Sequence, residues 1–398
     1  MSSENVVITH ALRTPIGKYL GGLSGLTAAE LGIHVVKSVV AQSGVAAADV
    51  GELVFGNARQ AGGGPNVARQ ILVKSGLPQT ATAYTVNMAC GSGLKSIALA
   101  AETIRRGDAT VTIAGGTESM SRLPFLLEGF RTGYRLGHAP VVDAMYKDGF
   151  DCPMAKKPMG ATAETLAKKY EIPRSEQDDF AAWSQQKCEA ARKAKRFADE
   201  IAPITIEGPI HKSGPTVVDA DEHPRDGITA AGMAKLPPVF DKNGTVHAGN
   251  SSGITDGAAA VVLMAEGEAK RRGITPLARL GEFVASGVDP EIMGIGPVPA
   301  FRELSRRTGR KIDDFDLIEL NEAFAAQVLA CDRELKLPRE RLNVNGGAIA
   351  LGHPIGATGA RIVVTLLHEM KRRNVKRGLA TLCVSGGLGL AFEFESTR

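Results

Sequence analysis

Two stretches, Asp49-Val-Gly-Glu-Leu-Val-Phe-Gly-Asn57 and Asp313-Asp-Phe-Asp-Leu-Ile-Glu-Leu-Asn321, follow one pattern in a chain of 398 residues. Each begins with Asp, continues as an apolar segment of strand length and ends with Asn at the same offset. Further on, Val86-Asn87 and Val344-Asn345 each introduce a loop of small residues. This common order of features predicts that the chain contains a duplicated unit.

An amphipathic helix is predicted after each of the two loops. In the first helix, the apolar positions with i, i+3, i+4, i+7 spacing are Leu94, Ile97, Ala98, Ala101 and Ile104. In the second helix, the apolar stripe consists of Ile362, Val363, Leu366, Leu367 and Met370. Gly107 stands where a left-handed residue commonly ends a helix. Because a short apolar strand (110–114 or 379–384) and a glycine pair follow each helix, we predict an α/β protein with two similar packed units.

The stretch 120–252 has a different character, with more than half of the chain's prolines, and we interpret it as an insertion in the first half. The predicted organisation is an N-terminal half formed by 1–119 and 253–276, the inserted loop domain 120–252, and a C-terminal half, 277–398. The clearest element of the insertion is a helix over 175–198. Its acidic start and basic end complement the helix dipole, and a phosphate-binding role for the basic end is the less favoured alternative.

Composition and charge exclude several classes of protein. Lys and Arg (47) against Asp and Glu (43) give a net charge of +4, too small to favour a nucleic-acid partner. The longest apolar run, 258–265, is too short to span a bilayer. The five cysteines lack CxxC spacing, and His211, His223 and His247 lack the spacing of metal ligands, so we expect no metal site. Scattered cysteines and an N-terminus without a targeting pattern predict a cytoplasmic protein.

Cys90 is the strongest candidate nucleophile. It lies in Asn87-Met-Ala-Cys-Gly-Ser-Gly93, directly before the first predicted helix. The free N–H groups and the positive dipole end of a helix N-terminus favour a thiolate, so we expect a lowered pKa for this thiol. The neighbouring glycines leave room for a substrate at the sulfur and for backbone N–H groups to face an oxyanion. A small buried structural thiol is the alternative interpretation.

His353, Cys383 and Asn321 are the other candidate reactive residues. His353 lies in the loop 345–359, which has five glycines and is the repeat counterpart of the loop that carries Cys90. The two residues can therefore meet across a pseudo-twofold axis, with the imidazole as base or hydrogen-bond donor. Cys383 ends the last apolar strand, and Asn321 is a strand-terminal amide that can order a water.

These residues together resemble the thiolases, the acyl-CoA C-acyltransferases, over essentially the whole chain. The blocks that carry the resemblance are Val86 to Leu94, Asp219 to Arg225, Ala248 to Ala259, Asn321 to Gln327, Val344 to Arg361 and Cys383 to Gly389. The resemblance implies a five-layered αβαβα fold of two duplicated halves with an inserted loop domain. It also implies a homotetramer assembled as a dimer of dimers, and a role in fatty-acid and lipid metabolism. The implied partners are acyl-CoA, acetyl-CoA and free coenzyme A, with no nucleic acid, membrane, metal or redox cofactor.

The resemblance further implies a ping-pong mechanism. Cys90 would attack an acyl-CoA and keep the acyl group as a thioester while His353 takes the thiol proton. Cys383 would then move a proton at the α-carbon of acetyl-CoA, in condensation or in thiolysis. Asn321 would hold the water that, with His353, stabilises the enolate oxygen. The backbone N–H groups of Cys90 and Ser385 would form a second oxyanion hole.

The same resemblance assigns substrate contacts. Two positions match residues that contact coenzyme A, namely Arg225 and Ser252. Three positions match the walls of the acyl pocket, namely Met159, Phe240 and Phe324.

Two residues depart from the family pattern. Ser385 stands where glycine is more usual, but its role is carried by a backbone N–H. Pro158 stands where short-chain enzymes usually have His, and a prolyl ring cannot donate a hydrogen bond to a 3-oxo group. A range broader than acetoacetyl-CoA is therefore our expectation. The alternatives are a ketosynthase-like condensing enzyme, disfavoured by the second cysteine, Cys383, and a non-catalytic acyl-CoA-binding protein, disfavoured by the complete reactive set.

Overall fold

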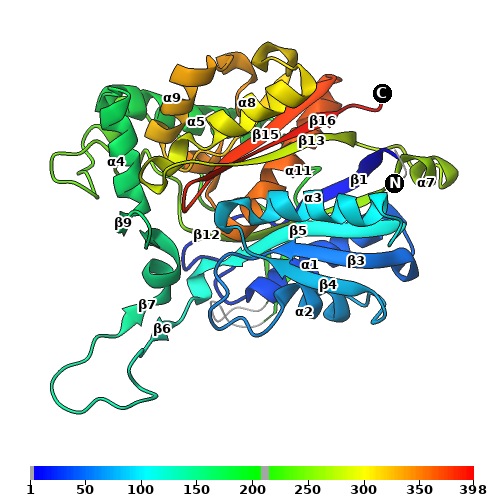
Figure 1. Cartoon of the computed structure of the whole chain (residues 1–398), viewed down its shortest axis with the longest axis horizontal. Coiled ribbons are helices and arrows are strands. Elements are labelled where there is room, and N and C mark those ends of the chain that lie inside the picture. The colour runs from blue at the N-terminus through cyan, green and yellow to red at the C-terminus, as the bar shows by residue number, and fades with distance from the viewer. Residues whose placement is uncertain (1–3, 208–214) are drawn as a thin grey trace.

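The computed structural model describes residues 4–207 and 215–398. Its main sheet has the strand order β14-β15-β16-β13-β1-β12-β5-β3-β4 (Figure 1). The strands of this order are β1 (Val6–Arg13), β3 (Val50–Gly56), β4 (Thr82–Val86), β5 (Val111–Ser119), β12 (Thr255–Ala265), β13 (Ala278–Gly287), β14 (Leu317–Leu320), β15 (Arg377–Val384) and β16 (Leu388–Glu395). A short strand, β2 (Gly17–Lys18), pairs with β12 at the side.

The strand directions repeat between the two halves of the sheet. In one half, β3 is parallel to β4 and β5, and β5, β12 and β1 follow one another antiparallel. In the other half, β14 is parallel to β15, and β15, β16 and β13 follow antiparallel. A parallel bridge between Ile318 and Leu342 takes the place of the β3–β4 pairing. The predicted duplication is therefore confirmed, and the halves join through a short pairing of β1 with β13.

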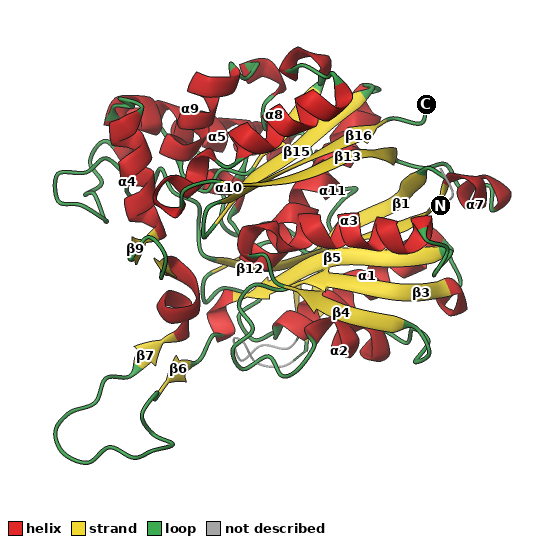
Figure 2. Ribbon diagram, in the orientation of Figure 1, coloured by secondary structure: helices red, strands yellow, loops and turns green. Residues whose placement is uncertain are grey.

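Helices separate and cover the two halves of the sheet, as Figure 2 shows. The pair α3 and α11 lies in the middle and contacts strands of both halves. One outer layer contains α1 and α2, and the other contains α8 and α9. The bounds of these helices are α1 (Ala28–Ser43), α2 (Val67–Lys74), α3 (Ser92–Arg105), α8 (Pro297–Thr308), α9 (Ala325–Leu335) and α11 (Ile355–Arg373). The arrangement confirms the expected five layers of alternating helix and sheet.

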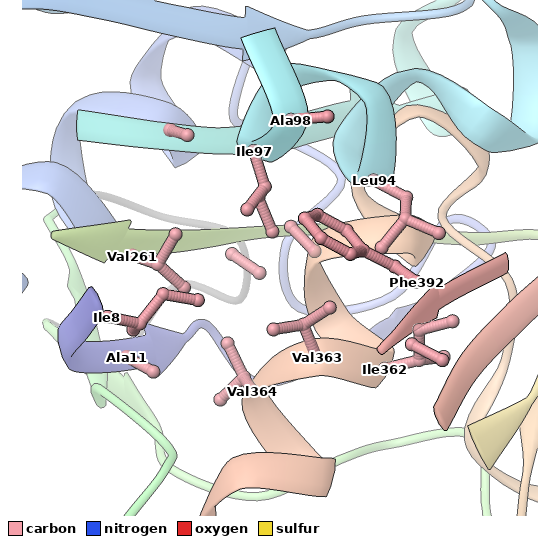
Figure 3. Packing of buried hydrophobic residues seen from close by; sticks show 14 of the residues in the cluster. Ile8, Ala11, Leu94, Ile97, Ala98, Val261, Ile362, Val363, Val364 and Phe392 are labelled. Atoms are coloured by element: carbon pink, nitrogen blue, oxygen red, sulfur yellow. The ribbon is translucent and has the colours of Figure 1, made fainter. Parts of the chain in front are cut away.

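The apolar faces of α3 and α11 form the centre of the molecule. Figure 3 shows Leu94 and Ile97 of α3 close to Val363 of α11 and to Phe392 of β16, and all four side chains are buried. Burying such side chains contributes about 1.5–3 kcal/mol each. After α3 the chain turns at Gly107 with φ 79°, the predicted left-handed position. The two predicted helices are thus held together by their own apolar stripes.

The first predicted glycine pair does not end its strand. Gly115 and Gly116 lie inside β5, where a Cβ on Gly116 would stand 2.9 Å from the Ala357 Cα. Close packing against α11 therefore requires glycine there. The second pair, Gly386 and Gly387, does form a turn, with φ 87° at both residues.

The chain between β5 and β12 forms short strands and several helices. The domain boundaries given from the sequence stay a prediction. The elements of this stretch are β6 (Phe125–Leu126), β7 (Val142–Asp143), β8 (Asp151–Cys152), β9 (Lys157–Pro158), α4 (Met159–Lys169), α5 (Arg174–Lys193), β10 (Ile204–Ile206), β11 (Thr216–Val218) and α6 (Ala230–Met233). The helix predicted over 175–198 ends earlier, because the chain turns at Lys195 with φ 52°. Two further helices complete the fold, α7 (Glu266–Arg271) and α10 (Ala348–Leu351). None of the helices among the described residues is long and apolar enough to cross a membrane.

A buried ion-pair network ties β1 to this inserted stretch. The Arg13 guanidinium donates to Glu200 at 2.6 Å and to Asp221 at 2.7 Å, and all three side chains are almost fully buried. Desolvation opposes the charge of Arg13, but the two carboxylates outweigh it and raise the pKa of the guanidinium. Losing one member of such a network leaves uncompensated buried charge, which costs about 3–5 kcal/mol.

Candidate active site

A cavity of about 370 Å³ collects the predicted reactive residues. Its wall includes Cys90, His353 and Cys383. The predicted substrate contacts on the same wall are Met159, Arg225, Phe240, Ser252 and Phe324. Neither Asn321 nor Ser385 belongs to this lining. The cavity is therefore built by the starts of α3 and α11, the end of β15 and the inserted stretch.

Glycines allow α3 and α11 to cross closely enough to bring Cys90 and His353 together. A Cβ on Gly93 of α3 would lie 2.8 Å from the Ala360 backbone nitrogen. A Cβ on Gly359 of α11 would lie 2.9 Å from the Leu94 Cα. Both contacts are with backbone, so a larger residue could be accommodated only by separating the helices. These glycines explain why the loops that carry Cys90 and His353 both reach the wall of the same cavity.

Cys90 lies in a sharp turn before α3. Ala89 has φ 44°, an uncommon conformation for a residue with a side chain. The Ser92 hydroxyl braces the turn by donating to the Ala89 carbonyl at 2.6 Å and accepting from the Met88 N–H at 2.9 Å. This strained turn presents the Cys90 sulfur at the cavity wall, where the residue is 8% exposed.

The expected lowering of the Cys90 pKa is not found. Burial raises the pKa of this thiol above its ordinary value, while the Arg59 charge and the backbone N–H of Ser385 act in the opposite direction. The sequence argument considered the helix terminus but not the loss of water around the sulfur. In the free protein, burial therefore favours the protonated thiol of Cys90.

His353 lines the same cavity as Cys90. Its Nδ1 lies 2.6 Å from the Thr358 hydroxyl, and that hydroxyl lies 3.0 Å from the Pro354 carbonyl. Because the hydroxyl donates its single proton to the carbonyl, it accepts the Nδ1–H, and Nε2 keeps its lone pair. Nε2 is buried and has no partner among the described residues. Burial, with the charges of Arg361 and Arg59, lowers the pKa of His353 to about 3, so the ring is neutral.

Cys383 and Asn321 lie at the ends of two neighbouring strands, Cys383 in the last residues of β15 and Asn321 directly after β14. Cys383, on β15, is 1% exposed, and burial together with the neighbouring Cys90 raises its pKa well above the ordinary value. Asn321 follows β14 and is also buried. Neither the amide oxygen nor the amide nitrogen of Asn321 has a partner among the described residues. Buried polar atoms of this kind are usually satisfied by water or by a ligand.

Ser385 lies in a second, smaller cavity of about 260 Å³. Arg59, Asn87 and Ala89 line the same cavity. The backbone N–H of Ser385 favours the charged form of the Cys90 sulfur. The predicted use of this N–H toward Cys90 is therefore compatible with the geometry, while the serine side chain lies outside the lining of the larger cavity.

The larger cavity opens into a neighbouring cavity of about 250 Å³ at its mouth, which is formed by the residues that both cavities share, His223, Arg225 and Ala248. The sequence analysis names His223 only as a histidine that lacks the spacing of metal ligands. Its Nδ1 lies 2.8 Å from the Ala350 carbonyl, and burial lowers its pKa. His211 lies outside the described residues. No group of three or more His, Cys, Asp or Glu in 4–207 and 215–398 is placed to hold a metal ion.

One side of the cavity, which includes the predicted acyl-pocket residues, is apolar. The rings of Phe240 and Phe324 meet edge to face with centroids 6.4 Å apart. The sequence analysis missed further apolar lining residues, which are Met120, Tyr146, Phe150, Val239, Met293 and Ile355. Pro158 also lines the cavity, directly before α4. Lone hydrophobic residues give no signal in a sequence, so only the fold could identify this wall.

Glu118 on β5 connects the loop after β3 to the start of α11. Its carboxylate accepts from the backbone N–H groups of Ala58, Arg59 and Gly356, and from the Asn57 amide. Gly356 belongs to the first turn of α11, whereas Asn57 follows β3. A glutamate inside an apolar strand was the signal that could have found this residue.

Comparisons with known proteins agree with this geometry. Residues 6–267 match the family described as "Thiolase, N-terminal domain", and residues 274–396 match "Thiolase, C-terminal domain". The chain is 52% identical to the acetyl-CoA acetyltransferase of Pseudomonas aeruginosa over 98% of each protein, and 50% identical to that of Shinella zoogloeoides over the full length of both.

Solved structures give the same result. The acetyl-CoA acetyltransferase of Bacillus anthracis superposes with a TM-score of 0.96 at 45% identity, with 98% of each chain covered. Human mitochondrial 3-ketoacyl-CoA thiolase superposes with a TM-score of 0.95 at 41% identity, with 99% of each chain covered. The fold, the full-length sequence matches and the reactive residues gathered in one cavity lead to a single assignment: this chain belongs to the thiolase family.

Proposed function

We propose that this acyltransferase catalyses the reversible thiolytic cleavage of 3-ketoacyl-CoA and the reverse Claisen condensation with acetyl-CoA. The observation that carries the proposal is the meeting of Cys90, His353 and Cys383 on the wall of one cavity. A nucleophile, a neutral base and a second proton-transfer group are the parts that such a reaction needs. The curated relatives named above as acetyl-CoA acetyltransferases support the same chemistry.

The first half-reaction forms an acyl-enzyme. His353 Nε2 takes the thiol proton as the Cys90 sulfur attacks the carbonyl carbon of the acyl-CoA. The bond from this carbon to the CoA sulfur breaks, and coenzyme A leaves as a thiol with that proton. When the substrate is a 3-ketoacyl-CoA, the Cys90 sulfur attacks the 3-keto carbon instead, and the bond between C2 and C3 breaks. The leaving enolate of acetyl-CoA takes a proton from Cys383, and His353 returns to Cys383 the proton that it took from Cys90.

The second half-reaction uses the other cysteine in the condensing direction. Cys383 gives its thiol proton to His353 Nε2 and, as a thiolate, removes the α-proton of acetyl-CoA. The resulting enolate attacks the thioester carbonyl of acyl-Cys90. The Cys90 sulfur leaves as a thiolate and takes the proton held by His353. Because the pKa of Cys383 is raised by burial, its thiolate is a strong base once formed.

Two oxyanion sites share the charge that develops. We assign the enolate oxygen to a water on the Asn321 amide and to His353 Nε2 while this nitrogen carries a transferred proton, supported by the unpartnered polar atoms of both side chains. We assign the tetrahedral oxyanion on Cys90 to the backbone N–H groups of Cys90 and Ser385. Removing one such donor typically costs about 100- to 1000-fold in rate. We propose that no metal or redox cofactor takes part.

The substrate lies along the mouth and the apolar wall. Arg225, with the backbone near Ser252, is proposed to face coenzyme A, and the phenyl rings of Phe240 and Phe324 the acyl chain. The wall around Pro158 offers no hydrogen-bond donor from that side chain, so we propose a substrate range broader than acetoacetyl-CoA. A panel of 3-ketoacyl-CoA substrates tests this: a kcat/KM for acetoacetyl-CoA far above that for 3-ketohexanoyl- and 3-ketooctanoyl-CoA would contradict it.

We also propose a homo-oligomer, a tetramer formed as a dimer of dimers. The arm between β6 and β7 projects from the body (Figure 1) and exposes Phe130 and Leu136, at 70% and 99%. Exposed apolar side chains on one arm are typical of an assembly surface.

Five buried free cysteines support a cytoplasmic location, and the substrate class supports a role in fatty-acid metabolism.

The covalent step has a direct test. Brief exposure to acetyl-CoA, rapid acid quench and peptide mass spectrometry should show an acetyl group on the Cys90 peptide. The Cys90→Ser variant is the matched control and should carry none at that position. A wild-type protein without the adduct would contradict the ping-pong mechanism and favour the binding-only alternative.

A further inference from the structure

Arg59 is a buried cation beside the candidate active site. It follows β3 and is 6% exposed. Its Nη1 donates to the Asp148 carbonyl at 2.8 Å, and its backbone N–H donates to Glu118 at 3.0 Å. The guanidinium Nε is buried and has no partner among the described residues. A guanidinium held by a neutral carbonyl keeps its full charge available to its surroundings.

The loop that contains Arg59 packs against the loops that hold the Cys90 sulfur. Asn87, three residues before Cys90, donates from its amide to the Ala58 carbonyl at 3.1 Å. Arg59 also lines the smaller cavity together with Ala89 and Ser385. The residue before Cys90 and the residue whose N–H faces its sulfur therefore share one cavity with the guanidinium.

The electrostatic effect of Arg59 has the direction that a nucleophile needs. After burial itself, the Arg59 charge is the largest influence on the pKa of Cys90, and it lowers it. The same charge also lowers the pKa of His353. His353 is neutral before it takes a proton, so it cannot supply positive charge to the sulfur at the start of the reaction.

Other titratable groups face Cys90 as well. Glu118 on β5 opposes thiolate formation. Cys383 on β15 is a second buried thiol, and His353 precedes α11. Lys147 lines the smaller cavity, but its side chain is half exposed and its ammonium pairs with Glu128 at 3.1 Å. Arg59 is thus the buried permanent cation in this set.

A glycine of the inserted stretch fixes where the guanidinium lies. A Cβ on Gly149 would stand 2.5 Å from the Arg59 Nε and 2.7 Å from its Cζ. Gly149 belongs to the single helical turn Tyr146–Phe150, whose two aromatic end residues line the acyl wall of the larger cavity. The turn that shapes the acyl pocket therefore also seats Arg59.

We propose that Arg59 is a positioning residue for acyl transfer: it holds a buried positive charge next to Cys90, in a seat formed by Gly149, so that the thiolate can form inside a cavity that otherwise disfavours it. The inference rests on the proposed role of Cys90 as nucleophile. It assigns a task to a residue that touches neither substrate nor reacting atoms. A purely structural role for Arg59 would leave the ionisation of Cys90 unchanged.

The test measures that ionisation without any substrate. Alkylation of Cys90 by iodoacetamide is followed from pH 6 to pH 11, with peptide mass spectrometry to separate Cys90 from Cys383. In Arg59→Gln, the midpoint of the profile should move up by about one pH unit, the usual effect of losing a nearby opposite charge. The rate at pH 7 should fall about four- to tenfold, since higher basicity partly offsets the smaller thiolate fraction.

Three further variants complete the experiment. Arg59→Lys keeps the charge and should stay within about twofold of wild type. Gly149→Ala keeps Arg59 but displaces the guanidinium, so its profile should move in the same direction as that of Arg59→Gln. Arg105→Gln removes a charge of the same sign from the far end of α3, about 20 Å along the helix, and should change nothing.

Each outcome decides the proposal. A folded Arg59→Gln protein with the wild-type alkylation profile overturns it. If Arg59→Gln does not fold, an unchanged profile in Gly149→Ala overturns it, and a shifted profile supports it. Failure of the proposed function is distinct, because it would appear as a wild-type protein that alkylates normally at Cys90 but forms no acyl adduct with acetyl-CoA.

Discussion

Replacing Gly359 by alanine tests how the two reactive loops are brought together. Gly359 lies where α11 crosses α3, and a Cβ there would stand 2.9 Å from the Leu94 Cα and closer still to the Leu94 backbone nitrogen. Helix backbone cannot rotate aside as the end of a side chain can. The helices must therefore separate by about 1 Å to admit one methyl group into a fully packed crossing.

The expected magnitudes follow from that displacement. Overpacking of a buried crossing costs about 1–3 kcal/mol. The better helix propensity of alanine offsets about 1 kcal/mol, so the free energy of unfolding should fall by at most about 2 kcal/mol. Activity should suffer more than stability, because a shift of about 1 Å between nucleophile and base can lower the rate about 100-fold.

The assay compares denaturant unfolding and the rate of Cys90 acetylation in Gly359→Ala and wild type. Gly267→Ala in α7 is the matched control, because its Cβ would meet only the flexible ends of Glu4 and Arg271. The control should keep the wild-type rate and lose no stability, because alanine favours the helix and meets no fixed atom there. A Gly359→Ala protein with wild-type stability and acetylation rate would refute the role assigned to the helix crossing.

Three further predictions concern charge, pH and specificity. Arg13→Met should lower the free energy of unfolding by about 3–5 kcal/mol, since two buried carboxylates lose their cation, whereas Arg306→Gln at the surface should have almost no effect in the same denaturant titration. The pKa of His353 is lowered from 6.5 to about 3 in the folded protein, so below pH 6.5 this histidine binds a proton in the unfolded chain but not in the folded one. The free energy of unfolding should therefore decline as the pH falls below 6.5, and this decline should be weaker in His353→Asn. The kcat/KM for acylation should rise with pH as Cys90 ionises and show no acid limb near pH 6.5; such a limb would contradict a neutral His353. Pro158→His should raise the kcat/KM ratio of acetoacetyl-CoA to 3-ketohexanoyl-CoA, and an unchanged ratio would remove this position from the account of specificity.

Periodicity and repetition predicted the elements that decide the fold. The spacing from Leu94 to Ile104 identified α3, and Gly107 identified its end. The glycine pair at Gly115 was misinterpreted as a strand end, because its real cause is the close approach of α11. A local pattern shows that a residue must be small, but not which distant segment requires it.

The reactive residues of the candidate site could also be placed from the sequence, since the repeat puts the loops of Cys90 and His353 in equivalent positions. The direction of the Cys90 pKa was wrong, because burial depends on tertiary packing and outweighs the helix terminus. The supporting residues Glu118 and Thr358 were missed for a related reason. Each acts through a contact whose partner is fixed only by the folded chain.

The division of labour between the two cysteines is the central claim, and one measurement tests it most directly. Single-turnover analysis of Cys383→Ala with acetyl-CoA would follow the acetyl group on Cys90 and the condensed product in the same quenched samples. We predict acetylation of Cys90 at close to the wild-type rate and no condensation product. Loss of acetylation together with condensation in a folded protein would contradict the opposed roles of Cys90 and Cys383.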